Sequence, residues 1–333
     1  MVEPLAAWPG LAGAERTALP GGWESPVGAD HALAGIRWSV PEGRPMTQAA
    51  LLTEAGRHRY LLLGEKHDNP DHHRLQALIV AAVAQPDAVI AFEMLDEDDA
   101  DQLPTPLSAS LGSPPDPGLS FEAQADQLAE AVGWAESGWP DFALYRGLFA
   151  ASLEGGLGIV PALPARARLK DAMMKGLQSV DPQALLGLRL EREYTAEMLL
   201  EIEEQIQEVH CGQAPPSILP AMVLGQRLKD AWMARALEQE SVPEAAARQV
   251  PRPAAILIAG GGHARRDRGA PMFLDRPGDA FTILLLEVPR TGQSVSPADF
   301  AGQADVLWFT PRLDDEDPCV KFAEELKKLG PVE

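Results

Sequence analysis

Cysteine is scarce in this chain: only Cys211 and Cys319 occur among its 333 residues. Two cysteines do not make the disulfide framework that holds small secreted domains together. The two could pair, but they lie so far apart in the sequence that we expect two free thiols. The chain is long enough to bury a large hydrophobic core without such a framework.

Basic residues are also few, with 28 Lys and Arg against 49 Asp and Glu, which gives a formal net charge of −21. A surface of this kind cannot neutralise phosphates over a broad face, so the composition argues against a nucleic-acid-binding protein. It argues equally against a surface made for anionic membranes. We therefore expect no nucleic-acid partner.

Long apolar runs are missing as well. No run approaches the roughly 20 residues that span a bilayer. The first residues, MVEPLAAWPG, contain neither the basic region nor the long apolar region of a signal peptide. The sequence as written predicts a soluble protein without an export signal. A mature form whose leader had been removed would look the same, so the localisation stays open.

Short apolar segments alternate with helical periodicity along most of the chain. Hydrophobic residues make up 46% of the sequence, as in globular proteins. Strands are predicted at residues 34–40, 60–63, 88–92, 157–163, 254–259, 281–288 and 306–309. Strands that are apolar throughout and alternate with helices predict a three-layer α/β/α fold with a mostly parallel or mixed sheet. We expect one domain over residues 31–333, preceded by an irregular arm over residues 1–30.

A helical hairpin is predicted as an insertion over about residues 181–245. Its first helix should begin at Asp181-Pro182 and run to about Val209, and its second should cover about residues 218–240. Acidic and then Pro/Ser-rich residues over 96–120 predict a surface loop. A short terminal helix is expected over residues 318–329.

Three of the predicted strands end in polar residues that could carry chemistry. The first runs into Glu65 and His67 in the sequence GEKH, the second ends at Glu93, and a third runs into GGGH, which ends at His263. In α/β proteins the carboxyl ends of strands form the ligand-binding edge of the sheet. A His67, Glu93 and His263 set would suit a divalent metal such as zinc, iron or manganese. Each feature alone also has an ordinary reading as a cap, an ion-pair partner or a turn.

Two more histidines begin the helix that follows the first of these strands. Asn69 and Pro70 predict the start of that helix, with Asn69 as N-cap. On a helical wheel His72 leans toward the apolar face, so we expect His72 to contribute to the cofactor-binding pocket. His73 points the other way and is predicted to face solvent.

Several motifs resemble a known family. The stretches GEKHDNPDHHRLQ and AVIAFEML resemble the ChaN-like proteins, the haem-binding uptake group of the Tiki superfamily. The likeness continues through SGWPDFALYR, HCGQAPPSILPAMVLGQRLKDAWMA and ILIAGGGHARRDRGAP, and it covers about residues 30–290 in the same order. The resemblance implies a three-layer fold with a helical insertion and a role in haem binding and iron acquisition. Its members are often envelope lipoproteins, yet no lipobox cysteine occurs here.

The resemblance also implies candidate catalytic residues. Related Tiki and erythromycin-esterase proteins are hydrolases that use the G-x-x-H turns and the strand-end glutamate. Carried over to this chain, these positions are His67, Glu93 and His263, with Glu65 as a further candidate. A hydrolase of this kind would use His67 or Glu65 as general base, acting on water either directly or on a metal.

Haem binding makes other demands: an axial ligand, an apolar slot and basic groups for the propionates. Tyr145 is a candidate ligand, although a part-buried core tyrosine is the commoner outcome. His210 either faces the same cleft or complements a helix C-terminus. The propionate candidates are Arg146, Arg265 and Arg266. Two subunits could pair around the ligand as a homodimer.

One helix face and one further hypothesis also follow from the sequence. Gln226, Arg227 and Asp230 are predicted to lie on a solvated helix face. Besides the haem protein and the hydrolase, a third hypothesis gives the strand-end residues a purely structural role.

Overall fold

A mixed eight-stranded sheet organises the computed structural model, which describes residues 8–17, 19–86, 88–104, 118–239 and 253–321. The strand order is β2-β1-β8-β7-β3-β6-β4-β5. The bounds are β1 Arg37–Ser39, β2 Arg44–Pro45, β3 Tyr60–Glu65, β4 Val89–Asp96, β5 Gly158–Leu163, β6 Ala255–Gly260, β7 Ala280–Glu287 and β8 Val306–Thr310. The six strands from β8 to β5 are parallel, and β1 pairs antiparallel with both β8 and β2. The predicted α/β fold with a mixed sheet is confirmed.

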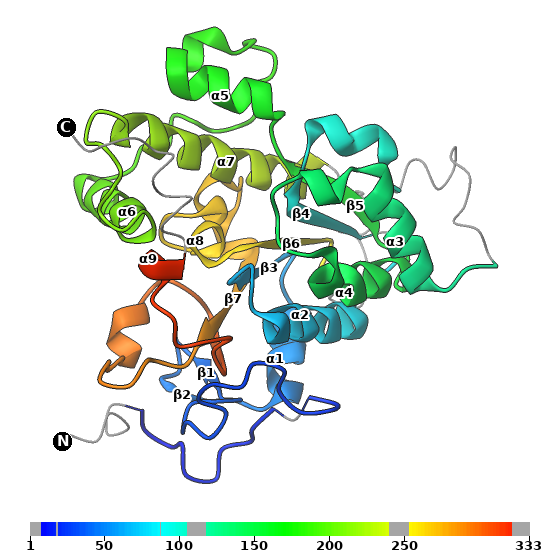
Figure 1. Cartoon of the computed structure of the whole chain (residues 1–333), viewed down its shortest axis with the longest axis vertical. Coiled ribbons are helices and arrows are strands. Elements are labelled where there is room, and N and C mark those ends of the chain that lie inside the picture. The colour runs from blue at the N-terminus through cyan, green and yellow to red at the C-terminus, as the bar shows by residue number, and fades with distance from the viewer. Residues whose placement is uncertain (1–7, 18, 87, 105–117, 240–252, 322–333) are drawn as a thin grey trace.

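Helices cover both faces of the sheet, in two groups that Figure 1 shows on opposite sides. One group is α1 Gln48–Ala55, α2 Pro70–Val83, α3 Phe121–Ala131 and α4 Phe142–Glu154. The other is α5 Arg166–Lys175, α6 Ala196–Val209, α7 Leu219–Gln239 and α8 Gly261–Ala264. No helix in the described parts of the chain is both long and apolar enough to cross a bilayer.

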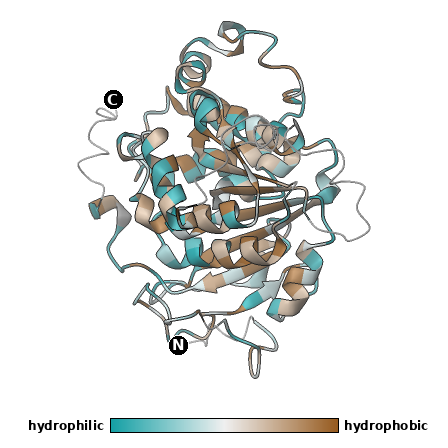
Figure 2. Cartoon of the chain, turned by 90° about the vertical axis from the view of Figure 1, so that its right-hand side faces the viewer, coloured by the Kyte–Doolittle hydropathy of each residue, from teal (hydrophilic) through white to brown (hydrophobic). Residues whose placement is uncertain are grey.

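Two hydrophobic cores separate the sheet from these layers, because side chains alternate along each strand. In β3, Leu61 and Leu63 pack in the core beneath α2 and α4, whereas Tyr60 and Leu62 pack in the core beneath α7. All four side chains are at least 95% buried. Figure 2 shows the apolar strands lying between helices of mixed polarity. Burial on both faces explains why the strands read as continuous apolar runs.

The helical insertion differs from the prediction at its start. Helix α6 begins at Ala196, not at Asp181, and Thr195 caps it by accepting a hydrogen bond from the Met198 backbone N–H. Turns precede it, because Arg189 has a φ of 49° and lies in the left-handed region, which a right-handed helix cannot include. The second insertion helix is confirmed as α7.

Some predicted segments reach outside the described residues. Of the helix predicted over 318–329, only α9 Pro318–Lys321 is described. The insertion was placed up to about residue 245 and the surface loop over 96–120, and their residues 240–245 and 105–117 are likewise outside.

The N-terminal segment packs against the antiparallel end of the sheet. The described residues between 8 and 36 form no helix or longer strand, and a single bridge among them pairs Val27 with Arg312. Trp8 is 2% exposed, and its ring lies edge-on to Trp38 at a centroid distance of 4.9 Å. The segment is therefore irregular but contributes to the core.

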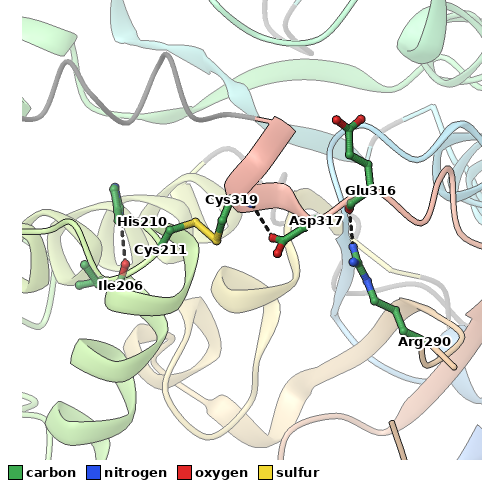
Figure 3. Close-up of a disulfide and its surroundings, with 7 residues drawn as sticks. All are labelled: Ile206, His210, Cys211, Arg290, Glu316, Asp317 and Cys319. Atoms are coloured by element: carbon green, nitrogen blue, oxygen red, sulfur yellow. Dashed lines mark hydrogen bonds between the residues drawn. A yellow bond between two sulfur atoms is a disulfide. The ribbon is translucent and has the colours of Figure 1, made fainter. Parts of the chain in front are cut away.

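A disulfide joins Cys211 to Cys319, with a Cα–Cα distance of 5.6 Å, so the expectation of two free thiols was wrong. The bond ties the turn after α6 to α9 (Figure 3). Sequence alone did not reveal it, because 108 residues separate the two cysteines and only the tertiary fold brings them together.

Candidate functional site

Four predicted residues meet at the carboxyl edge of three neighbouring strands. β3, β6 and β4 are adjacent and parallel, so their ends share one edge of the sheet. Glu65 ends β3 and His67 lies in the turn after it; Glu93 lies in β4, and His263 follows β6 within α8. This is the edge at which the sequence pattern predicted a site.

Glu65 holds His67 in a defined orientation. Nδ1 of His67 lies 2.9 Å from Oε1 of Glu65, whose side chain is fully buried. Burial raises the pKa of Glu65. The charge of His73 and the hydrogen bonds from His67 and His73 outweigh this effect, so the pKa of Glu65 lies well below its usual range. Glu65 is therefore an acceptor, Nδ1 of His67 carries the proton, and Nε2 bears the lone pair when the ring is neutral.

A second histidine lies behind the same carboxylate. His73 is 1% exposed, and its ring packs on Tyr145 at 4.0 Å, so the prediction that it faces solvent was wrong. Its Nε2 donates to the His67 carbonyl at 2.9 Å, and its Nδ1 lies 3.2 Å from Oε2 of Glu65. Burial lowers the pKa of His73, but the charge of Glu65 and these hydrogen bonds raise it overall. The helical wheel failed because α4 covers the side of α2 that carries His73.

Glu93 lies between the two site histidines. Its Oε1 is 3.3 Å from Nε2 of His263, and its Oε2 is 3.7 Å from Nε2 of His67. Oε2 also accepts a 2.7 Å hydrogen bond from the backbone N–H of Gly260. Burial raises the pKa of Glu93, but the charge and hydrogen bond of His263 outweigh it and lower the pKa far below the usual range. Glu93 is therefore a buried carboxylate anion.

Asp230 contacts Nδ1 of His263 and orients that ring, as Glu65 orients His67. It is 4% exposed, and its Oδ1 lies 2.6 Å from Nδ1 of His263, while Tyr194 donates to its Oδ2 at 3.2 Å. The expectation that Asp230 lies on a solvated helix face was therefore wrong. Burial lowers the pKa of His263, but Glu93 and Asp230 raise it to about 9. Two histidines thus face Glu93, each with a buried carboxylate on its far nitrogen.

A cavity of about 490 Å³ opens onto these groups from the side of α6 and α7. Besides the four strand-end residues, its walls include Tyr194, Ile202, Gln205, Val209, Gln226, Lys229, Asp230 and Arg268. Glycines keep its floor clear: a Cβ at Gly260 would lie 3.0 Å from Nε2 of His67, and one at Gly262 would lie 3.1 Å from Nε2 of Gln205. The side chain of His67 is 32% exposed and lines this cavity, with Nε2 at 3.7 Å from Oε2 of Glu93.

A smaller cavity of about 260 Å³ also borders Glu93. Met94, Leu163 and Leu169 line it together with Trp139, whose ring lies edge-on to His67 at 5.0 Å. Glu93 therefore borders two cavities, and the wall of the smaller one is the more apolar.

Comparison with known proteins identifies the family. The family model described as "Haem-binding uptake, Tiki superfamily, ChaN" matches residues 51–274, about two thirds of the chain. The chain belongs to this ChaN family. The matched range contains all four strand-end residues. No curated protein matches the sequence.

One of the solved structures similar to this ChaN-family chain has a TM-score above 0.5. ChaN of Campylobacter jejuni, whose structure is described as showing cofacial heme binding, has 17% identity and a TM-score of 0.59 over 82% of this chain and 95% of its own. The type III effector HopBA1 has 14% identity and a TM-score of 0.39, over 79% and 92%. A mutant of the erythromycin esterase EreC in its open conformation has 12% identity and a TM-score of 0.40, over 84% and 98%.

Three predicted cofactor-binding residues lie away from both cavities of this ChaN-family site. Tyr145 is fully buried and donates to Oε1 of Glu65 at 2.9 Å; burial and Glu65 raise its pKa, which disfavours the phenolate. His72 is also fully buried: its Nδ1 accepts from the Lys66 N–H, and its Nε2 contacts Thr310. Burial lowers the pKa of His72 to about 3. His210 caps α6 and contacts a carbonyl of that helix through Nδ1.

The predicted propionate arginines are occupied elsewhere. Arg265 pairs with Asp267 and Arg266 pairs with Asp305, and neither lines the cavity at the strand ends. Arg146, the third candidate, pairs with Asp126 near the surface.

The three residues predicted as a metal set, His67, Glu93 and His263, contact one another at the edge of the sheet. Among the described residues, no group of three or more His, Cys, Asp or Glu side chains is arranged to hold a metal ion. Each of the three has protein partners instead, which occupy both oxygens of Glu93 and Nδ1 of each histidine.

Sequence reasoning missed Lys229, Gln205 and Arg268 in the cavity wall. One signal was available, because Arg268 falls in the ARRDRGAP part of the family-like stretch. Lys229 and Gln205 lie on long helices among many polar residues, where periodicity does not mark an inward-facing polar group.

Proposed function

We propose that this chain binds haem in the cavity at the ends of β3, β6 and β4, and acts in haem or iron uptake. The family supports the haem part of the proposal, and the observation that locates it is His67, a part-exposed residue of the cavity wall whose Nδ1 is held by Glu65. A histidine whose far nitrogen donates to a carboxylate is a strong, oriented ligand for iron. Ile202 and Val209 offer apolar contact, while cations on the wall suit carboxylate groups. Bound haem would supply the iron and the porphyrin, either as cargo or as cofactor.

A homodimer around the ligand is part of the proposal. The heme groups of the Campylobacter jejuni protein are described as cofacial. In this chain Val209 borders the cavity and is 62% exposed, which leaves apolar surface at its mouth. Sedimentation with and without hemin tests this: a mass that stays that of one chain on loading contradicts it.

Hemin titration of the purified protein tests haem binding. We expect a shifted Soret band in the wild type that is lost or strongly weakened in His67→Ala, because the ring nitrogen available to iron is removed. His31→Ala is the matched control, since His31 lies in the N-terminal segment outside the cavity. A wild-type spectrum identical to free hemin, or equal loss in both variants, contradicts the proposal.

A second function, hydrolysis of an ester or amide, has one observation in its favour. Two histidines, each oriented by a buried carboxylate, contact a third carboxylate, Glu93, in the wall of the cavity. In this hypothesis His67 takes a proton from water at Nε2, and Glu93 and His263 position that water. An ester panel with wild type and His263→Ala tests it; absence of turnover in the wild type sets it aside.

A further inference from the structure

We propose that Lys229 and Arg268 form an anion subsite in the cavity, which selects ligands with a carboxylate or phosphate and orients them over His67. The inference rests on the proposed binding function and names its ligand class. Both cations border one cavity of a chain whose net charge is −21. Keeping two cations there, one of them buried, costs desolvation energy that an anionic ligand would offset.

Arg268 is the buried member of the pair. It is 6% exposed, and Nη2 donates to Oε1 of Gln205 at 2.6 Å. Nη1 is buried and makes no hydrogen bond with any described residue. The nearest carboxylate in its ion pairs is Glu201, 3.9 Å from Nε, and that side chain is 46% exposed. The guanidinium therefore has an unused donor and only a weak internal counter-charge.

The backbone fixes where Arg268 lies. A Cβ at the next residue, Gly269, would lie 2.3 Å from the carbonyl oxygen of His263. The backbone at Gly269 therefore packs directly against the backbone of His263. The side chain of Arg268 is thus held relative to His263 by main-chain packing and by Gln205.

Lys229 supplies the second charge from α7. Its Nζ lies 3.1 Å from Nε2 of His263. Among the described residues no carboxylate pairs with it directly, although the charges of Glu93 and Asp230, which both contact that histidine, act on it. A ligand anion that contacted Lys229 and Arg268 would gain charge-assisted hydrogen bonds from both. The rest of the ligand would then extend toward His67, which borders the same cavity. For haem, the anionic groups are the propionates.

Hemin and its dimethyl ester, in which both carboxylates are masked, provide the test. Each is titrated into wild type, Arg268→Gln, Lys229→Gln and the control Arg266→Gln, whose arginine pairs with Asp305 outside the cavity. We expect the wild type and the control to bind hemin at least about 10-fold more tightly than the ester. In both cavity variants hemin should weaken to the level of the ester, and the ester should be little affected.

Each outcome decides the proposal. If the wild type binds hemin and the ester equally, the subsite is overturned but haem binding is not. The same holds if a cavity variant weakens the binding of hemin and of the ester by the same factor. If the wild type binds neither, haem binding fails and calorimetry with inorganic phosphate decides the subsite. Phosphate binding that Arg268→Gln abolishes then supports it, and absence of phosphate binding overturns it.

Discussion

The disulfide between Cys211 and Cys319 gives the most direct quantitative prediction. It closes a loop over a sequence separation of 108 residues. Restricting an unfolded chain by a loop of that length is worth about 5 kcal/mol at 25 °C in the loop-entropy model. With an unfolding entropy of about 2.1 cal/mol/K per residue, this corresponds to a Tm change of about 7 °C for a chain of this size. We expect the double variant Cys211→Ser/Cys319→Ser to melt lower by about that amount.

The bond also ties a cavity wall to the segment that packs on the site. Its α6 end carries Ile202 and Gln205, which line the cavity. Its other end leads to Lys321, 3.6 Å from Asp68 in the turn after β3. Amide hydrogen exchange should therefore rise in α6 when the bond is removed, while the core strands remain protected.

Scanning calorimetry with and without a dithiol reductant checks the reasoning. Reduced wild type should match the double variant, and the reductant should not change the Tm of the variant. If oxidised wild type, reduced wild type and double variant all melt within about 1 °C, the bond contributes no measurable loop entropy and the prediction is refuted.

Two further predictions concern the site. Gly269→Ala should lower the free energy of unfolding by about 2 kcal/mol or more in chemical denaturation, because its Cβ would clash with the His263 backbone. Gly278→Ala is the control: its Cβ meets nothing within 4 Å, so the substitution should be close to neutral. His263 has a pKa raised from 6.5 to about 9, so the stability it contributes is complete below pH 6.5 and is lost as the pH rises through about 9. The free energy of unfolding should fall over that range, and Glu93→Gln should reduce the fall; an equal slope in both proteins would contradict this.

The sequence was sufficient to predict the layers and the strand-end residues, because both follow from local patterns. A strand buried on both faces reads as an apolar run, and a polar residue directly after it lies at the carboxyl edge by geometry alone. That is why Glu65, His67, Glu93 and His263 could be placed together.

What failed depends on contacts between distant segments. Asp230 pairs with a histidine 33 residues away, and Cys211 with a cysteine 108 residues away, and neither distance leaves a local trace. His73 looked exposed because a helical wheel takes account of one neighbouring surface, whereas α2 is covered by the sheet on one side and by α4 on another. A polar residue whose partner comes from another element is the general case that periodicity cannot resolve.

Both proposed functions depend on one atom, Nε2 of His67. Iron ligation needs its lone pair, and so does general-base catalysis. Burial lowers the pKa of His67, but Glu65 and Glu93 raise it above 6.5 overall, so either activity should increase as the pH rises through that pKa. The pH dependence therefore does not separate the two functions, but a substitution of His263 does. His263 is not needed for iron to bind His67, whereas hydrolysis needs a group there to hold water or substrate. In His263→Ala, retained hemin binding with lost turnover would show that hydrolysis needs both histidines and hemin binding does not need His263. Loss of both would show that the two carboxylate-backed histidines act as a unit.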